Sequence, residues 1–351
     1  MFPLHLTHFP LSFVAGFMAS KALFAALDVE IFEHIANSPS GLTCVALHAQ
    51  LPMRATVEVD QLQTLLTSLG ALGLLARSFD GVYTNSKGAD LFLAKTNMAY
   101  DYGDYLRYQI DKQMFPFMSH LNSIMKGEGR TEQKFEDYQS WMSDPAEARL
   151  YTESQHSGSI GPAITLARKE EARLSGCRTL LDIGGGSGGF SITLAGRFPE
   201  LSCVVMDFPE VCKVGEEFLA EAPAEVSSRV DFLPGNALTS DLPKGQDVII
   251  LSYLCGSVPG DSLAELYSRC FEALNPGGML IVHDFMVENS RDGPKLSALW
   301  ALQHMIFVPG GVGLTPGLVG GLMLEAGLSE VISRDHIPGM TKRVIGVKSS
   351  A

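Results

Sequence analysis

The N-terminal part of the chain carries apolar residues at roughly helical spacing over residues 11–36, which predicts two packed helices. Two further helices are predicted, one starting near Thr43 and one over residues 56–75. The residues that follow alternate around Asp80-Gly81, a dipeptide typical of a tight β-hairpin. Helix, turn, helix and hairpin in this order predict a winged-helix domain over residues 1–97.

The pattern changes twice after this domain. Residues 98–175 are predicted to be largely helical, a connector that can also wall a pocket. From residue 178 onward, short apolar runs alternate with helical segments, which predicts a doubly wound α/β sheet in a Rossmann-like domain over residues 176–351. The candidate strands are residues 179–183, 202–206, 229–233, 247–251, 278–283 and 343–347.

Charge bears on the winged helix, because such domains often bind DNA. The chain has 39 acidic and 26 basic residues and a formal charge of −13, which repels polyphosphate and anionic membrane surfaces. Residues 1–95 hold five basic and seven acidic side chains, so no basic reading face is expected. The sequence therefore predicts a structural or dimerising domain and no nucleic-acid partner. The alternative, a DNA-binding regulator, would require a salt-sensitive gel shift.

Cysteine usage and apolar segments indicate a cytoplasmic protein. The six cysteines lack CxxC pairs and paired Cys/His spacing, so neither a disulfide framework nor a metal site is expected. The first residues lack the features of a signal peptide. Residues 308–324 have few charges, but glycines and prolines interrupt them too often for a membrane helix. No membrane partner is expected.

The strongest local signal is DIGGGSGG at residues 182–189, placed between a predicted strand and a predicted helix. Glycines there allow a sharp turn and let a ligand approach the main-chain N–H groups. The loop satisfies the GxGxxG pattern of NAD enzymes, which is weak alone. Asp182 is awkward beside a pyrophosphate but suits the ammonium group of an amino-acid moiety, which favours S-adenosylmethionine (SAM). The loop residues expected to bind it are Asp182, Gly184, Gly186 and Gly188.

Further cofactor contacts are expected at the ends of the next strands. Asp207 closes the second strand, where a carboxylate can accept both hydroxyls of an adenosine ribose, in SAM or NAD alike. Asn236 and Ala237 follow the third strand, in position to bracket an adenine ring. Ser252, at the end of the fourth strand, completes the expected cofactor set.

Three motifs together resemble a known family. LLDIGGGSG at 180–188, VVMDFPEV at 204–211 and LNPGG at 274–278 are similar to segments of the SAM-dependent small-molecule O-methyltransferases that include the plant caffeate and acetylserotonin enzymes. The resemblance covers nearly the whole chain. It implies a homodimer, a seven-stranded sheet whose last hairpin is antiparallel, and an acceptor pocket between two domains. Asn236 stands where the family usually has Asp, which alters the expected adenine contact.

The chain departs from this family at its catalytic base. The family carries a segment resembling LSNVLHDW, whose histidine deprotonates the acceptor hydroxyl. Residues 251–259 read LSYLCGSVP, with Gly256 in place of the histidine and Ser257 in place of its acidic neighbour. A positioned base typically contributes about 10²- to 10⁴-fold to the methylation of a hydroxyl. A thioether sulfur carries no proton, so orientation and exclusion of water can supply most of the catalysis.

Several side chains are candidates for the acceptor site. The resemblance implies that helices near residues 151–159 and 300–304 face the acceptor, and positions 151, 155 and 159 share one side of a helix. Each residue also has a structural reading: His304 as a hydrogen-bonded wall residue, Asp284 as the cap of a strand. The catalytic candidates are Tyr151, His304 and Asp284. The substrate-binding candidates are Tyr108, Arg149, Gln155, His156, Trp300 and Gln303.

The missing histidine leads to our functional hypothesis. We expect methylation of a thioether such as 4-methylthio-2-hydroxybutyrate, as in the methylthiohydroxybutyrate S-methyltransferases of dimethylsulfoniopropionate synthesis, which resemble this family. Such a substrate needs a donor for its carboxylate, from Arg149, Tyr151, Gln303 or His304. O- or C-methylation of a phenolic or enolic natural product stays open, as does a SAM-binding pericyclase on the same scaffold.

Overall fold

The computed structural model describes residues 9–95, 102–128, 137–308 and 313–350. The chain forms two compact units, residues 1–112 and 113–351. The boundary between the units falls inside the helical connector predicted over residues 98–175. The predicted division into residues 1–97, 98–175 and 176–351 stays a prediction. Within the described residues, no helix combines the length and apolar character needed to cross a membrane.

The N-terminal unit combines helices of six to 20 residues with a small antiparallel sheet of strand order β1-β3-β2. Local capping determines where helices begin: the Thr43 hydroxyl accepts from the backbone N–H of Ala46, and Glu58 and Gln61 form a capping box. Helices and hairpin follow the predicted order. The elements are α1 Phe9–Asp28, α2 Ile31–Ala36, β1 Leu42–Thr43, α3 Cys44–Gln50, α4 Val59–Ala71, β2 Leu75–Arg77, β3 Val82–Asn85 and α5 Lys87–Phe92, followed by a π-helical segment, Tyr105–Met114.

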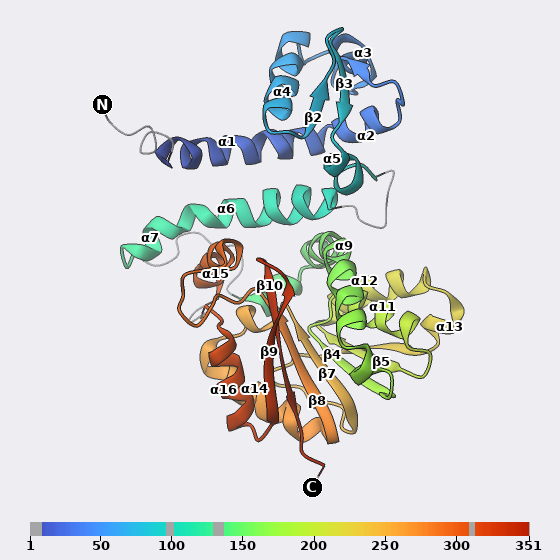
Figure 1. Ribbon diagram of the computed structural model, residues 1–351, viewed down its shortest axis with the longest axis vertical. Coiled ribbons are helices and arrows are strands. Elements are labelled where there is room, and N and C mark those ends of the chain that lie inside the picture. Colours follow the sequence, from blue (N-terminus) through green and yellow to red (C-terminus); the bar gives the residue numbers. More distant parts are fainter. Residues whose placement is uncertain (1–8, 96–101, 129–136, 309–312, 351) are drawn as a thin grey trace. The chain divides into compact units, whose positions relative to one another are not determined.

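A seven-stranded sheet of order β6-β5-β4-β7-β8-β10-β9 forms the centre of the C-terminal unit (Figure 1). Strands β4 to β8 pair in parallel, whereas β10 is antiparallel to both β8 and β9. This confirms the predicted α/β methyltransferase-like sheet with its antiparallel last hairpin. The strands are β4 Thr179–Ile183, β5 Ser202–Asp207, β6 Val230–Pro234, β7 Gln246–Ser252, β8 Leu274–Asp284, β9 Ser329–Ile337 and β10 Thr341–Val347.

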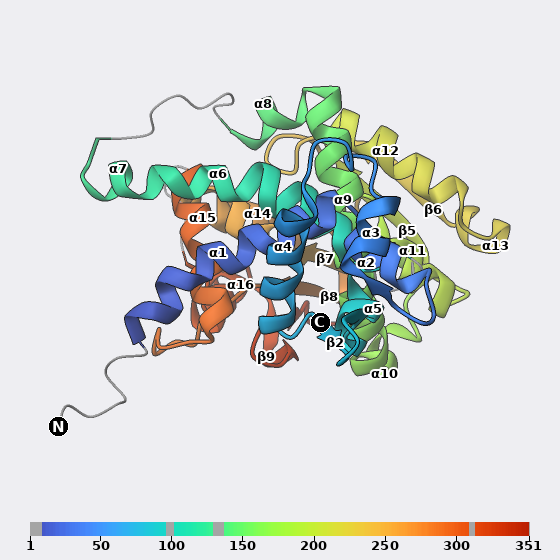
Figure 2. The same cartoon turned by 90° about the horizontal axis from the view of Figure 1, so that it is seen from above.

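Helices cover both faces of this sheet (Figure 2). Leu166 and Leu194 from α9 and α11 belong to the apolar cluster of one face, and Leu263 and Val319 from α14 and α16 to that of the other. The helices are α6 Phe115–Phe117, α7 Leu121–Met125, α8 Tyr138–Met142, α9 Pro145–Lys169, α10 Glu171–Leu174, α11 Gly189–Arg197, α12 Pro209–Ala220, α13 Ala224–Ser227, α14 Gly260–Ala273, α15 Lys295–Phe307 and α16 Pro316–Glu325, with 3₁₀ turns at Met118–His120 and Cys255–Ser257.

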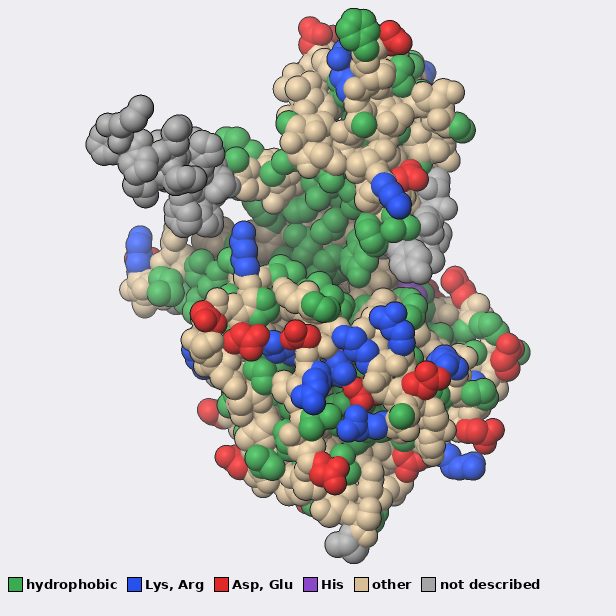
Figure 3. All heavy atoms as spheres, in the orientation of Figure 1, with side chains coloured by type: hydrophobic (Ala, Val, Ile, Leu, Met, Phe, Trp, Pro, Cys, Tyr) green, Lys and Arg blue, Asp and Glu red, His purple; other side chains and the backbone are tan. Residues whose placement is uncertain are grey.

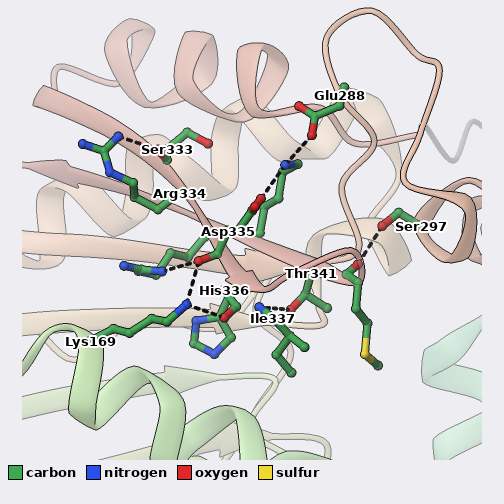
Figure 4. A network of polar contacts seen from close by, with 12 residues as sticks. Lys169, Glu288, Ser297, Ser333, Arg334, Asp335, His336, Ile337 and Thr341 are labelled. Carbon is green, nitrogen blue, oxygen red and sulfur yellow. Dashed lines mark hydrogen bonds and ion pairs between the residues drawn. The ribbon is translucent and has the colours of Figure 1, made fainter.

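Polar contacts join the β9–β10 hairpin to α9 (Figure 4). The Lys169 ammonium donates to the carbonyls of Asp335 and His336 at 3.0 and 2.8 Å. Lys342 pairs with both Glu288 and Asp335. Figure 3 shows basic and acidic side chains intermixed on the face over these strands. The contacts of Lys169 and Lys342 fasten the hairpin to α9 and to Glu288.

Candidate active site

A cavity of about 320 Å³ opens at the carboxyl ends of β4, β5 and β7. This edge is where open α/β sheets bind ligands, and the volume is in the range of small-molecule sites. All its described lining residues belong to the C-terminal unit. None of them is a lysine or an arginine, so a bound ligand meets hydroxyls, amides, carboxylates and apolar groups.

The glycine loop forms the floor of the cavity, and its glycines have different roles. Gly184, Gly186 and Gly188 adopt φ of 69°, 58° and 74°, the left-handed region that favours glycine. A β-carbon at Gly184 would lie 2.8 Å from Leu254 Cδ1, whereas one at Gly186 would meet no atom within 4 Å. Gly184 and Gly186 line the cavity. Gly188 does not; it is the N-cap of α11 and packs near Phe232.

Asp182 lies beneath this loop and is fully buried. One of its carboxylate oxygens, Oδ2, accepts from the Ser191 hydroxyl at 2.9 Å. The other, Oδ1, has no hydrogen-bond partner among the described residues. Burial raises the pKa of this carboxyl to about 7, and the side chain lines the cavity. A buried acceptor without a partner is costly, so this oxygen is suited to a cationic group of a ligand.

Asp207 ties the end of β5 to the glycine loop. Its Oδ2 accepts from the backbone N–H of Gly186 at 2.8 Å and its Oδ1 from that of Phe208 at 2.7 Å. Burial raises its pKa to about 6. Each carboxylate oxygen can accept a second hydrogen bond, so the side chain can hold the loop and still receive two ligand hydroxyls.

Asn236, Ala237 and Ser252 also line the cavity. The Asn236 amide donates to the side chain of Gln139 at 2.9 Å, which links α8 to the segment after β6. The Ser252 hydroxyl lies 2.9 Å from His283 Nδ1, and His283 Nε2 lies 2.9 Å from the Thr341 hydroxyl. Ser252 is therefore held by a buried histidine, which is itself bonded to Thr341.

These residues fit SAM. Asp182 offers an unpartnered carboxylate oxygen for the ammonium of the methionyl part, and Asp207 offers acceptors for ribose hydroxyls. The open space at Gly186 gives a ligand access to the loop backbone. Metal binding has no comparable basis: within the described ranges, no three His, Cys, Asp or Glu side chains are grouped as ion ligands.

Gly256 lies in the 3₁₀ turn after β7 and is buried. A β-carbon built on it would lie 2.6 Å from Nε2 of His304, closer than non-bonded atoms allow. His304 comes from α15, is 8% exposed, and its Nδ1 has no hydrogen-bond partner among the described residues. Burial lowers the pKa of this imidazole to about 4. An imidazole from another helix thus occupies the space next to position 256.

Asp284, the last residue of β8, is buried on the other side of this turn. Its Oδ2 accepts from the backbone N–H of Gly256 at 3.3 Å and its Oδ1 from that of Phe285 at 2.8 Å. Burial raises its pKa to about 7. The side chain is not part of the cavity lining. This arrangement matches the structural reading of a strand cap, and a catalytic role for Asp284 stays a prediction.

The acceptor candidates separate into two groups. Tyr151 and Gln155 line the cavity from α9, as their spacing predicts. His156 does not: its Nδ1 lies 2.8 Å from the Ser187 hydroxyl and its ring stacks on Phe218 at 3.9 Å, so it supports the glycine loop from outside.

Arg149 is placed differently from our expectation. It is exposed, and its guanidinium donates to Glu217 at 2.8 and 2.6 Å and to Glu153 at 2.8 Å. It lies outside the cavity lining. In this structure the Arg149 guanidinium binds two carboxylates of its own chain, and its proposed role in receiving an acceptor carboxylate stays a prediction.

The remaining candidates contact other parts of the protein. Trp300 stacks on Phe285 at 4.6 Å between ring centroids, and Gln303 is buried; neither lines the cavity. Tyr108 belongs to the N-terminal unit, where the Arg107 guanidinium lies 5.7 Å from its ring. These three residues stay predictions as acceptor contacts.

The sequence interpretation missed several lining residues, above all Tyr138, Met142, Tyr253 and Val308. Tyr138 lies on α8, a helix of only five residues and too short to show a periodic pattern. Tyr253 lies within the LSYLCG segment that we singled out, and its φ of 56° is unusual for a bulky residue. Tyr253 could have been predicted as a lining residue from the sequence, because it is an aromatic residue directly after the end of a strand.

Comparisons with known proteins cover both units. The model of the O-methyltransferase domain matches residues 119–329, and that of the O-methyltransferase dimerisation domain matches residues 11–95. The chain is 26% identical to a 3-hydroxy-5-methyl-1-naphthoate 3-O-methyltransferase of Streptomyces sahachiroi, over 95% of this chain and 93% of that protein. It is 29% identical to the acetylserotonin O-methyltransferase of Rattus norvegicus, over 86% and 68%. The fold matches the crystal structure of human N-acetylserotonin methyltransferase in complex with SAM, with a TM-score of 0.85, 19% identity and 98% of each chain covered.

Proposed function

This chain belongs to the O-methyltransferase family, and from that premise we propose that it methylates a small molecule at an atom without a proton, a thioether sulfur. It is a SAM-dependent methyltransferase. The acceptor we propose is a thioether such as 4-methylthio-2-hydroxybutyrate. The observation that carries the proposal is the buried glycine at position 256, which provides no side chain to accept a proton.

The neighbouring ionisable groups do not restore a strong base. A phenol has a pKa near 10, and burial holds that of His304 at about 4. The His304 imidazole is therefore a weak base toward a phenol. The carboxyl group of Asp284 is not part of the described cavity lining. An acceptor that releases no proton needs no such base.

When bound, SAM supplies a methyl group activated by its sulfonium charge: the acceptor lone pair forms the new bond to carbon, and the electron pair of the broken C–S bond stays on the donor sulfur. A thioether acceptor then becomes a sulfonium, with no proton to remove. The rings of Tyr138, Tyr151 and Tyr253 line the cavity and can stabilise such a cation. Orientation by these walls and exclusion of water are the chain's contributions.

A second candidate is O-methylation of a hydroxyl on an aromatic molecule. Two relatives bear names that specify oxygen acceptors, a hydroxynaphthoate and acetylserotonin. The imidazole of His304 beside Gly256 is the feature that favours this candidate, because it brings a nitrogen near the place of the family histidine. C-methylation of an enol would equally need no histidine at position 256.

Incubation with labelled SAM and a panel of thioether, phenol and enol acceptors tests the proposal. We expect methylated sulfonium product from the thioether and an equal amount of S-adenosylhomocysteine. Turnover of the phenols alone would contradict the thioether proposal and favour the second candidate. Product without S-adenosylhomocysteine would contradict methyl transfer and favour a pericyclic reaction.

We also propose that the protein acts as a homodimer. The match of residues 11–95 to a dimerisation domain supports this. Helix α1 has exposed apolar side chains that a partner could cover, including Phe17 at 54% and Met18 at 57% exposure.

A further inference from the structure

We propose that Gly256 and His304 are an interdependent pair: the missing side chain at position 256 makes room for the His304 ring, which takes its place and positions the acceptor. His304 then acts as a positioning residue that hydrogen-bonds an oxygen of the acceptor, a hydroxyl or a carboxylate. This inference rests on the proposed use of the cavity for methyl transfer and names a residue that orients the substrate there.

The steric argument concerns the space between the turn and α15. A β-carbon at position 256 would lie 2.6, 2.8 and 3.0 Å from Nε2, Cδ2 and Cε1 of His304. These three atoms form the far end of the His304 side chain and move together, so a β-carbon at position 256 would displace the whole ring from its present position. In this conformation a side chain at 256 and the His304 ring exclude one another.

The position of the ring is supported from both sides. Trp300, one turn earlier on α15, stacks on Phe285 immediately after β8, which holds the helix against the end of the sheet. On the other side, the N–H of Gly256 donates to Asp284, which keeps the turn in place. Leu254 and Ser257, close neighbours of Gly256 in the chain, line the cavity. The ring thus lies next to the segment that forms the cavity wall, although neither His304 nor Gly256 is itself among the described lining residues.

The chemistry of the imidazole indicates hydrogen bonding. Nδ1 has no hydrogen-bond partner among the described residues, and the side chain makes none of the described hydrogen bonds. A neutral ring has one donor and one acceptor nitrogen, so it can bind an acceptor oxygen without transferring a proton. The described cavity lining has no lysine or arginine, so the polar groups of an acceptor meet neutral donors there, such as the hydroxyl of Tyr151 and the amide of Gln155. The low pKa of His304 agrees with a neutral ring.

A double-mutant cycle tests the pair, with Gly256→Ala, His304→Ala and the double variant. We expect Gly256→Ala to lower kcat/KM for the acceptor at least about tenfold, because it displaces the ring. His304→Ala should raise the acceptor KM about tenfold, as expected for one lost hydrogen bond in a buried site. In the double variant, removal of the ring leaves room for the new β-carbon. Its fold-loss in kcat/KM should therefore be clearly smaller than the product of the fold-losses of the two single variants.

Controls separate a local effect from misfolding. Gly321→Ala on α16 is the matched glycine control, because a β-carbon there meets no atom within 4 Å. It should leave kcat/KM within about twofold. The affinity for SAM and the melting temperature should stay near the unaltered values in each variant. If only Gly256→Ala fails to fold, comparison of His304→Ala with His304→Gln still tests the hydrogen bond. The glutamine amide can form it again, so the KM of His304→Gln should lie between those of His304→Ala and the unaltered protein.

Two results would overturn the pair. Strictly multiplicative single effects would show that residues 256 and 304 act independently. A pH–rate profile that loses a titrating limb in His304→Gln would show proton transfer and replace positioning by base catalysis. The cycle is measured with whichever acceptor turns over, thioether or phenol. Failure of the thioether proposal is therefore distinguishable from failure of the pair.

Discussion

The carboxyl group of Asp284 illustrates what burial does to an ionisable residue at this site. Its pKa rises from an ordinary 3.8 to about 7, chiefly because burial penalises the charged form. From about pH 4 to pH 7 the unfolded carboxyl is ionised, whereas the folded one still holds its proton. The free energy of unfolding therefore falls as pH rises through this window and stays low above it.

Asp284→Asn should remove this contribution. We expect the unfolding free energy of the variant to change less between pH 4 and pH 7 than that of the unaltered protein, by at most about 4 kcal/mol. Denaturant melts across this range measure the difference. Asp80→Asn, at an exposed position in the hairpin of the N-terminal unit, is the control and should leave the pH dependence unchanged. If the unfolding free energy of Asp284→Asn changed with pH as steeply as that of the unaltered protein, the raised pKa of Asp284 would be contradicted.

Asp182 allows a prediction about cofactor binding. Asp182→Asn removes the charge of the carboxylate whose Oδ1 lacks a partner, so SAM should bind about ten- to a hundredfold more weakly, the loss typical of one charged hydrogen bond. Titration calorimetry measures this affinity. Asp90→Asn, in α5 of the other unit, should bind SAM normally. Unchanged affinity in Asp182→Asn would show that the ammonium group binds elsewhere.

Candidate residues lie at the cavity where a local sequence pattern determines their position, although their roles stay predictions. Gly184 and Gly186 of the glycine loop, Asp207, Tyr151 and Gln155 line the cavity because strand ends and helical spacing determine where they lie. Arg149 lies outside the described cavity lining, and nothing local in the sequence indicates this because its main partner, Glu217, is 68 residues away in the chain. The contact between Gly256 and His304 likewise depends on how α15 packs, which no local pattern contains.

At the scale of elements, α9 connects the cavity to the last hairpin of the sheet. Its middle part brings Tyr151 and Gln155 to the cavity. At its end, Glu170 accepts from the buried Arg343 of β10, with Nε 2.7 Å from its Oε1. The side chains of Arg343 and Glu170 are 8% and 3% exposed. Loss of one partner would leave a buried charge uncompensated.

Glu170→Gln should therefore destabilise the protein by about 3 kcal/mol, measured by denaturant unfolding. The matched control is Glu200→Gln, because Glu200 and its partner Arg178 are 73% and 75% exposed. Exposed pairs contribute little, so the control should change stability by less than about 0.5 kcal/mol. Similar losses in both variants would mean that burial of the Arg343 pair has no special role.

Element predictions followed the strength of the apolar pattern. All six strands predicted from apolar runs are present, with ends shifted by up to four residues. Strand β9 was expected only through the family's last hairpin, because it lies at the sheet edge and mixes exposed with partly buried residues. The helix predicted over 56–75 is shorter, since the chain turns at Gly73, whose φ is 73°.

At the scale of the whole molecule, the dimerisation-domain match predicts the oligomeric state. Sedimentation equilibrium should give twice the 37.9 kDa mass of one chain at micromolar concentration. Replacing Phe17 and Met18 on α1 by serine should shift the mass towards one chain if this exposed helix contributes to the interface. A single-chain mass for the unaltered protein at every concentration would contradict the homodimer.

The central claim is that the acceptor atom gives up no proton, and the pH dependence of the methyl-transfer step tests it most directly. With saturating SAM and a thioether acceptor, single-turnover rates should stay nearly flat from neutral to moderately alkaline pH, because no group must be deprotonated as the bond forms. A rate that rises about tenfold per pH unit, following the ionisation of the acceptor, would contradict the claim.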